Sequence, residues 1–104
     1  MTDITKLHRE LVTRILDSDA MAPREMRRAA FDNEGLTEPT RTLIDKVAKH
    51  SYQVTDDDVA AARKSGLSED QIFEVVVCAA VGQASRQFEN ALAALTDATG
   101  RRGQ

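Results

Sequence analysis

The sequence predicts an all-α fold of about five helices, and three observations carry that prediction. Apolar residues recur every three to four positions in the first segment, helix start and stop signals punctuate the chain, and the stretch Ser65–Ala98 contains the longest apolar run. At 104 residues the chain has the size of a single domain, 1–104, with one modest core. Because only four residues are aromatic, we expect small aliphatic side chains to do most of the packing.

The first 36 residues predict two N-terminal helices. An amphipathic helix is expected from about Asp3 to Leu16, and a break follows in the segment DSDAMAP. The predicted inner face of this helix has apolar residues at helical spacing: Ile4, Leu7, Leu11 and Ile15. Pro23 is suited to the start of a short second helix that ends at about Phe31 and buries Ala30 and Phe31. We expect its three arginines to face water or an acidic neighbour: Arg24, Arg27 and Arg28.

The middle of the chain predicts two further helices. Thr37 is the expected cap of a third helix, with Pro39 close behind it. The inner face of that helix is predicted from its spacing: Leu43, Ile44, Val47 and Ala48. Thr55 precedes an acidic run, 56–58, in the first turn of a fourth helix. That helix is expected to stop at Gly66, because glycine suits the left-handed position past a helix end.

The last helix is the element around which the others are expected to pack. Ser68 and Gln71 form a capping box, which favours a helix from Glu69 over a buried strand, although three consecutive valines follow. A continuous helix over 69–98 spans about 45 Å at 1.5 Å per residue, more than four short neighbours can cover. We therefore expect a homo-oligomer. Gly82 either kinks this helix or lets another helix approach closely, and the tail 99–104 is expected to fray.

Composition and charge exclude several classes of function. The chain has 14 Lys and Arg residues against 17 Asp and Glu residues, and a net charge of −3 argues against a nucleic-acid partner. A single cysteine excludes an intramolecular disulfide and fits a reducing compartment. The N-terminus lacks the pattern of a signal peptide, and no apolar run reaches the ~20 residues that cross a bilayer. We expect a cytoplasmic protein with no membrane contact.

Cys78 and Glu74 are the first candidate catalytic residues. They lie one turn apart on the most polar stripe of the last helix, with Gln71, Ser85 and Glu89. A carboxylate one turn away raises the pKa of a thiol, which opposes a nucleophilic role. We therefore interpret Cys78 as a small packed residue, while Glu74 stays a candidate acid/base.

Arg86 is the candidate for ligand binding on this helix. It continues a stripe that is otherwise apolar, so it needs a partner, and Asp45 or the acidic run 56–58 is expected to supply a carboxylate. A ligand-binding role, together with Tyr52, is the alternative.

His50 is the remaining candidate catalytic residue. It continues the stripe of Leu43 and Val47, so we expect it to lie partly inward as a packed neutral side chain, or to act as a general base near Tyr52 and Cys78. The spacing of His and Cys residues indicates no metal site, and nothing predicts a cofactor.

The run VAKHSYQVTDDDVAAARKSGLSEDQIFEVVVCAAVGQASR resembles the C-terminal part of the carboxymuconolactone decarboxylase and alkylhydroperoxidase D (AhpD)-like superfamily. The likeness covers about residues 41–95 and rests on the segments V-T-x-x-D-V and G-L-S-x-x-x-I, followed by a long helix that carries Ser85 and Arg86. It implies an AhpD-like helical core over 37–98, assembly through helices and, in the peroxidase branch, a C-x-x-C motif followed by a histidine. This chain has no C-x-x-C, so the family's catalytic residues carry over to no position here.

Three hypotheses from different classes follow. The favoured one is a non-redox AhpD-like domain that acts through oligomeric assembly and through binding of a protein partner or small molecule at a subunit interface. The second is an enzyme, either of the decarboxylase type with His50 or Glu74 as acid/base, or a one-cysteine peroxidase that uses Cys78. The third is a helical regulator that contacts nucleic acid through the arginines of the second helix.

Overall fold

The computed structural model describes residues 2–102 of the chain and the side chains of residues 5–100. Residues 2–102 form five α-helices and one turn of 3-10 helix, with no strand among them, which confirms the predicted all-α fold. The elements are, in order, α1 (Thr2–Asp17), α2 (Arg24–Asp32), α3 (Thr40–Lys49), η1 (Ser51–Gln53), α4 (Asp56–Lys64) and α5 (Glu69–Arg102). None of these helices is both long enough and apolar enough to cross a membrane.

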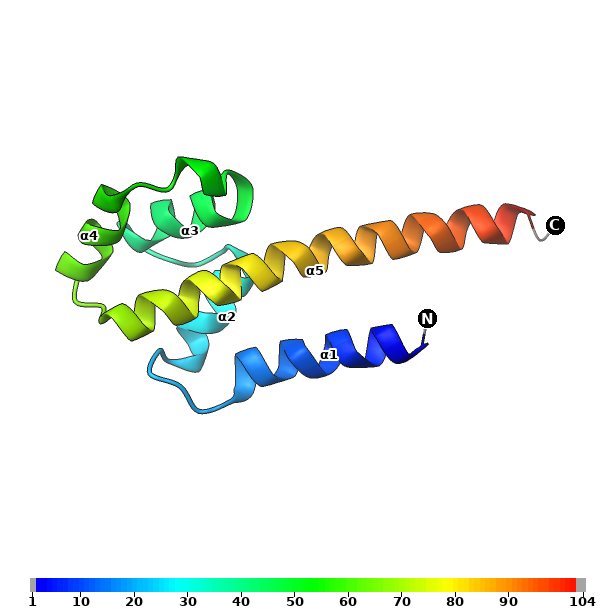
Figure 1. Ribbon diagram of the computed structural model, residues 1–104, viewed down its shortest axis with the longest axis horizontal. Coiled ribbons are helices and arrows are strands. Elements are labelled where there is room, and N and C mark those ends of the chain that lie inside the picture. The colour runs from blue at the N-terminus through cyan, green and yellow to red at the C-terminus, as the bar shows by residue number, and fades with distance from the viewer. Residues whose placement is uncertain (1, 103–104) are drawn as a thin grey trace.

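The long helix α5 is the axis of the molecule. Figure 1 shows α2, α3 and α4 gathered around its N-terminal part and α1 beside its middle, while its C-terminal end runs on alone past the start of α1. The overall dimensions, 57 × 29 × 20 Å, reflect this projection. The expectation of a frayed tail over 99–104 is wrong for residues 99–102, which continue the helix, and residues 103–104 lie outside the described part.

The helices α4 and α5 begin where the sequence predicts, and each begins with a reciprocal pair of hydrogen bonds between side chain and backbone. The backbone N–H of Ser68 donates to Gln71 Oε1 at 2.9 Å, and the N–H of Gln71 donates to Ser68 Oγ at 3.1 Å. Thr55 and Asp58 form the same reciprocal capping box at the start of α4. Gly66 follows α4 with a φ of +114°, the left-handed conformation expected of it.

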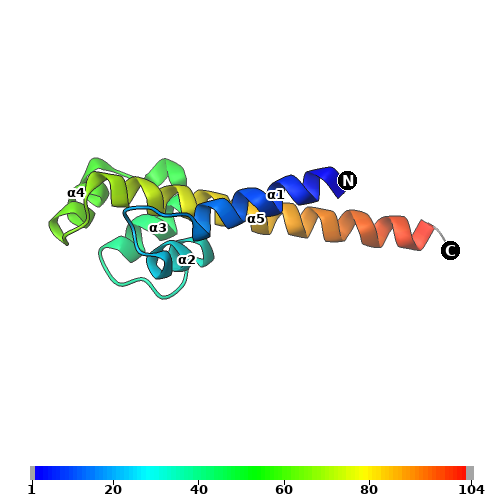
Figure 2. The same cartoon turned by 90° about the horizontal axis from the view of Figure 1, so that it is seen from below.

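The core lies where α2, α3 and α4 meet the first half of α5. One buried cluster joins α2, α3 and α5 and consists mainly of small side chains: Ala22, Ala30, Ile44, Val75, Cys78 and Ala79. A second joins α3, α4 and α5 and consists of Leu43, Ala62 and Ile72. Figure 2 gives the view from below. In it, α2 and α3 lie to one side of α5, and α1 runs along α5 and overlaps it. Small side chains let these helices pack closely in a chain with few aromatic residues.

Gly82 marks the closest approach between helices. The helix α5 continues through this residue without interruption, and a Cβ atom added there would overlap the carbonyl oxygen of Phe31 at the end of α2. Of the two alternatives, close approach is therefore the one the structure confirms. Glycine is needed here because the neighbouring atoms are backbone and have no flexible side chain to yield.

Two expectations about the N-terminal half are wrong. The helix α3 begins at Thr40 and not with Thr37 as cap, since Pro39 holds the N-cap position and no side chain caps the helix. The Glu38 carboxylate accepts hydrogen bonds from the N–H and the hydroxyl of Thr42, at 2.8 and 2.7 Å. Leu7 and Leu11 of α1 line an open groove beside α5 and are not part of the buried core, and Leu7 is 65% exposed. At the other end of α1 the expected side does face inward, since Ile15 packs against the core and Leu16 is buried.

Candidate functional site

Arg27 of α2 is buried in the structure, although we expected it to face water or an acidic neighbour. Its side chain is 3% exposed, and its Nε and Nη1 donate to the carbonyl oxygens of Ala22, at 3.1 Å, and Ile15, at 2.9 Å. Ile15 belongs to the last turn of α1, where carbonyl groups lack partners within the helix and where positive charge is favourable. Arg27 therefore closes the end of α1, and no described carboxylate forms an ion pair with it.

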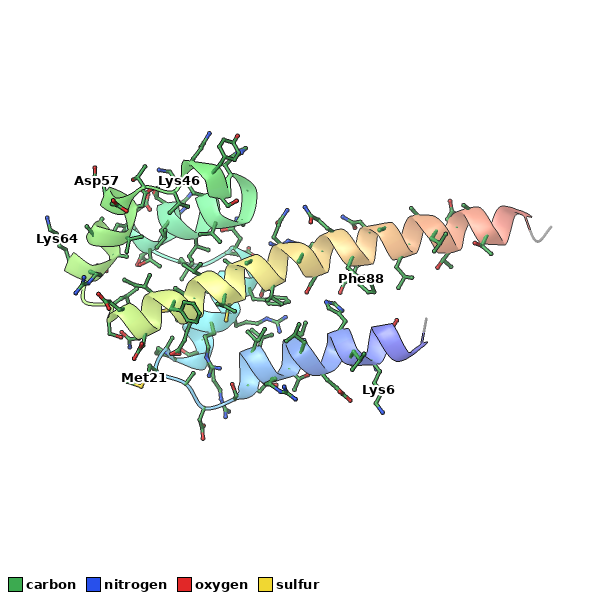
Figure 3. The ribbon with its side chains drawn as sticks, viewed as in Figure 1. Lys6, Met21, Lys46, Asp57, Lys64 and Phe88 are labelled. Carbon is green, nitrogen blue, oxygen red and sulfur yellow. The ribbon has the colours of Figure 1, made fainter. Side chains whose placement is uncertain are left out.

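Two polar side chains of α5 hold the same connection between α1 and α2. The Glu74 carboxylate accepts hydrogen bonds from the N–H groups of Met21, at 2.8 Å, and Ala22, at 3.2 Å. Gln71 Nε2 donates to the carbonyl oxygen of Met21 at 3.1 Å. Figure 3 shows Met21 on this connection, below the start of α5. We call Arg27, Gln71 and Glu74 the loop clamp, because together they satisfy the backbone of the segment between the two helices.

The loop clamp changes how the two candidate catalytic residues of α5 are interpreted. Both oxygens of Glu74 accept hydrogen bonds from backbone N–H groups, so its carboxylate has a structural task. Cys78 is buried in the core beside it. Burial raises the pKa of the Cys78 thiol; the Arg27 guanidinium opposes that rise, and the Glu74 carboxylate adds to it. The expected effect of Glu74 is present, but burial is the larger cause.

A cavity of about 220 Å³ lies beside the loop clamp. Its lining is mostly apolar and includes Ile15, Phe73 and Val77, and Arg27 and Cys78 also reach it. The sequence placed Glu74 and Cys78 together, and both line this cavity. The burial of Arg27 here was not predicted from the sequence. The signal was its spacing, because Arg27 lies three and four residues before Ala30 and Phe31, which were expected to be buried on the same face.

His50 and Tyr52 form a separate, exposed pair. The expectation that His50 lies partly inward is wrong, because α3 ends at Lys49 and the backbone leaves the helix at His50, with φ at −146°. Tyr52 is exposed on η1, its hydroxyl lies 3.4 Å from His50 Nδ1, and the two rings meet edge to face. Neither residue lines the cavity beside Arg27.

Arg86 has a backbone partner and not the expected carboxylate. Its Nη1 donates to the carbonyl oxygen of Phe31 at 2.7 Å, and its Nη2 donates to Gln83 Oε1 at 3.0 Å. Asp45 instead accepts from Asn33, and Asp58 pairs with Lys46. Arg86 therefore closes the end of α2 as Arg27 closes the end of α1. The two N-terminal helices each end on a guanidinium group from a neighbouring helix.

An apolar groove runs between the first half of α1 and the middle of α5. Its volume is about 430 Å³, and apolar side chains of both helices line it. Figure 3 shows Phe88 on the side of α5 that faces α1. His8 crosses the groove, with its Nε2 2.8 Å from Ser85 Oγ and its ring 4.8 Å from that of Phe88. Further along α5, Leu95 is 56% exposed. We call the following set the apolar face: Leu7, Leu11, Val81, Ala84, Phe88, Leu92 and Leu95.

The arginines of α2 form no continuous basic patch. Arg28 pairs with Asp32 at 3.0 Å, Arg24 lies 3.9 Å from Asp19, and Arg27 is buried. Within the described part of the chain, no three His, Cys, Asp or Glu side chains gather closely enough to hold a metal ion.

Comparisons of the chain with protein-family models, with curated proteins and with solved structures give no match.

Proposed function

We propose that this chain is a non-redox, AhpD-like helical domain that acts by assembly, and that its apolar face binds a second copy of the chain. The observation that carries the proposal is the spacing of the apolar face on α5. Its members Val81, Ala84, Phe88, Leu92 and Leu95 follow one another at intervals of three and four residues. At ~100° per residue they lie within an arc of roughly 80°, the pattern of a coiled-coil seam.

A second copy fits this face better than a different partner. The chain carries both an apolar groove and a projecting helix with the same seam, so a twofold arrangement brings each α5 against the partner's groove and buries both. Two α1 and two α5 helices then form a four-helix bundle.

The enzymatic alternatives have less support. Peroxidase chemistry needs an accessible thiolate and a resolving partner, whereas Cys78 is a buried thiol and the only cysteine. The carboxylate of Glu74 is engaged with the backbone, and His50 lies elsewhere on the surface with Tyr52. Nucleic-acid binding through the α2 arginines is disfavoured because Arg27 is buried and Arg28 is paired.

Sedimentation velocity across a range of protein concentrations tests the assembly. We expect a dimer at tens of micromolar, and Leu95→Glu should weaken it about tenfold or more, because an apolar side chain of the seam is replaced by a charge. The matched control is Ala93→Glu, which adds the same charge at an exposed position of the same helix outside the seam. A monomer at tens of micromolar, or equal effects of the two variants, would refute the proposal.

A further inference from the structure

Arg27 has a donor nitrogen that the protein leaves without an acceptor. A guanidinium has three nitrogen atoms, and here Nε and Nη1 donate to carbonyl oxygens while Nη2 donates to no described group. Every side-chain nitrogen or oxygen sealed from solvent in the described residues has a hydrogen-bond partner. Nη2 is therefore not sealed, although the residue is only 3% exposed. The open space that Arg27 borders is the cavity beside the loop clamp.

The charge of Arg27 is only partly balanced. A buried cation costs several kcal/mol unless it is paired, and the two carbonyl groups at the end of α1 supply only partial negative charge. Glu74 also lines the cavity, but its two oxygens already accept hydrogen bonds from Met21 and Ala22. A second cationic residue, Arg14, lines the same cavity. An anion placed at Nη2 would meet the Arg27 guanidinium, in a cavity that Arg14 also lines and whose one carboxylate is already engaged.

The rest of the cavity is suited to a short hydrocarbon group. Ile15, Ala20 and Val77 contribute apolar walls, and the ring of Phe73, which is 69% exposed, stands beside them. The volume of about 220 Å³ equals that of roughly seven water molecules at ~30 Å³ each, which is below the range typical of drug-sized ligands. A ligand of this size has a single charged group and a short chain or one ring.

We infer that the cavity formed by Arg27, Arg14, Phe73 and Val77 is a binding site for a small carboxylate that carries a short apolar group. The carboxylate accepts from Arg27 Nη2, and the apolar group lies against Phe73 and Val77. This inference goes beyond the assembly proposed above and does not depend on it, because the cavity and the apolar face share no lining residue.

A titration of the full chain with benzoate and with benzamide tests the site. The two molecules have nearly the same shape, and only benzoate carries the charge that Arg27 requires. Binding is followed by nuclear magnetic resonance, through the Arg27 Nε–H and the Val77 methyl signals. We expect saturable shifts of both signals with benzoate and about tenfold weaker binding of benzamide. No saturable binding of benzoate, or equal binding of the two probes, would overturn the inference.

Variants that keep the fold separate this site from the assembly. Arg14→Gln should weaken benzoate binding about three- to tenfold, whereas Arg9→Gln, an exposed position of the same helix that does not line the cavity, should leave it unchanged. Equal effects of the two variants would contradict the inferred site. Leu95→Glu should bind benzoate as the unaltered chain does, even where sedimentation shows that it is monomeric. Loss of binding in that variant would move the site to a subunit interface and overturn the inference.

Discussion

Replacing Gly82 with alanine measures how tightly α2 lies against α5. In an isolated helix this change is favourable by about 1 kcal/mol, because alanine has the higher helix propensity. Here the added Cβ would overlap the carbonyl oxygen and the Cα of Phe31, which are backbone atoms of the neighbouring helix. No side-chain rotation relieves that overlap, so α2 has to move away from α5.

The cost of that movement is larger than the gain in propensity. The hydrogen bond from Arg86 to the Phe31 carbonyl, now 2.7 Å long, would lengthen or break, and a bond from a charged donor contributes about 1.5–3 kcal/mol. Ala30, which is fully buried beside this contact, would lose packing. A void on the order of 50 Å³ costs about 1.2 kcal/mol at ~24 cal/mol per Å³. After subtraction of the propensity gain, we expect Gly82→Ala to destabilise the fold by about 2–3 kcal/mol.

Urea denaturation followed by circular dichroism at one fixed protein concentration provides the assay, since assembly makes stability depend on concentration. Gly100→Ala is the matched control, because it is the same substitution in the same helix and no atom lies within 4 Å of the new Cβ. It should be neutral or stabilising by up to about 1 kcal/mol. Gly82→Ala should lower the melting temperature by roughly 10–20 °C. If Gly82→Ala is as stable as Gly100→Ala, the close contact between α2 and α5 is refuted.

Three further predictions concern Cys78 in the core, Arg27 of the loop clamp and the ion pair between Lys46 and Asp58. Cys78 should react with iodoacetamide only in denaturant, because burial covers the thiol and raises its pKa; rapid alkylation of the native chain would contradict this. Arg27→Met should lower the free energy of unfolding by about 2–4 kcal/mol through loss of two charge-assisted bonds, whereas the exposed Arg24→Met should change it by less than about 0.5 kcal/mol. The hydrogen bond from Lys46 lowers the pKa of Asp58, so its stabilising contribution is present above the unfolded pKa of ~3.9 and is lost as the pH falls through the lower folded value. Urea midpoints between about pH 2 and pH 6 should therefore vary less in Asp58→Asn than in the unaltered chain.

The helices themselves were predictable because their signals are local. The capping box at Ser68 depends on residues three positions apart and is present where the sequence predicts it. The start of α4 after Thr55 was likewise predicted from the acidic run, and the structure adds a second capping box there. Gly66 was assigned to the end of α4 from its position alone. The start of α3 was misplaced because Thr37 is a favourable cap by residue type, whereas the structure has Pro39 at the N-cap position and no side-chain cap.

The partners of the two inward arginines were not predictable from composition. We expected Arg86 and Arg27 to seek carboxylates or water, and each instead donates to carbonyl groups at the end of a helix. Those carbonyl groups are present in every helix, so they leave no mark in the sequence. Only the packing of α1 and α2 against their neighbours brings them within reach. Leu7 was misassigned for a related reason, since spacing shows that a helix has an apolar side but not which neighbour covers it.

The helix α1 is anchored at one end, and this has a consequence for its motion. Arg27 holds the carbonyl of Ile15, whereas Leu7 and His8 border an open groove beside α5, which His8 crosses to contact Ser85. A helix held in this way opens from its loosely covered end, so amide hydrogen exchange should be fastest near residues 5–8 and slowest near Leu16. A second copy seated on the groove would slow exchange at the fast end and leave the slow end unchanged. The difference in amide exchange rate between the two ends of α1 would therefore measure how fully the groove is occupied.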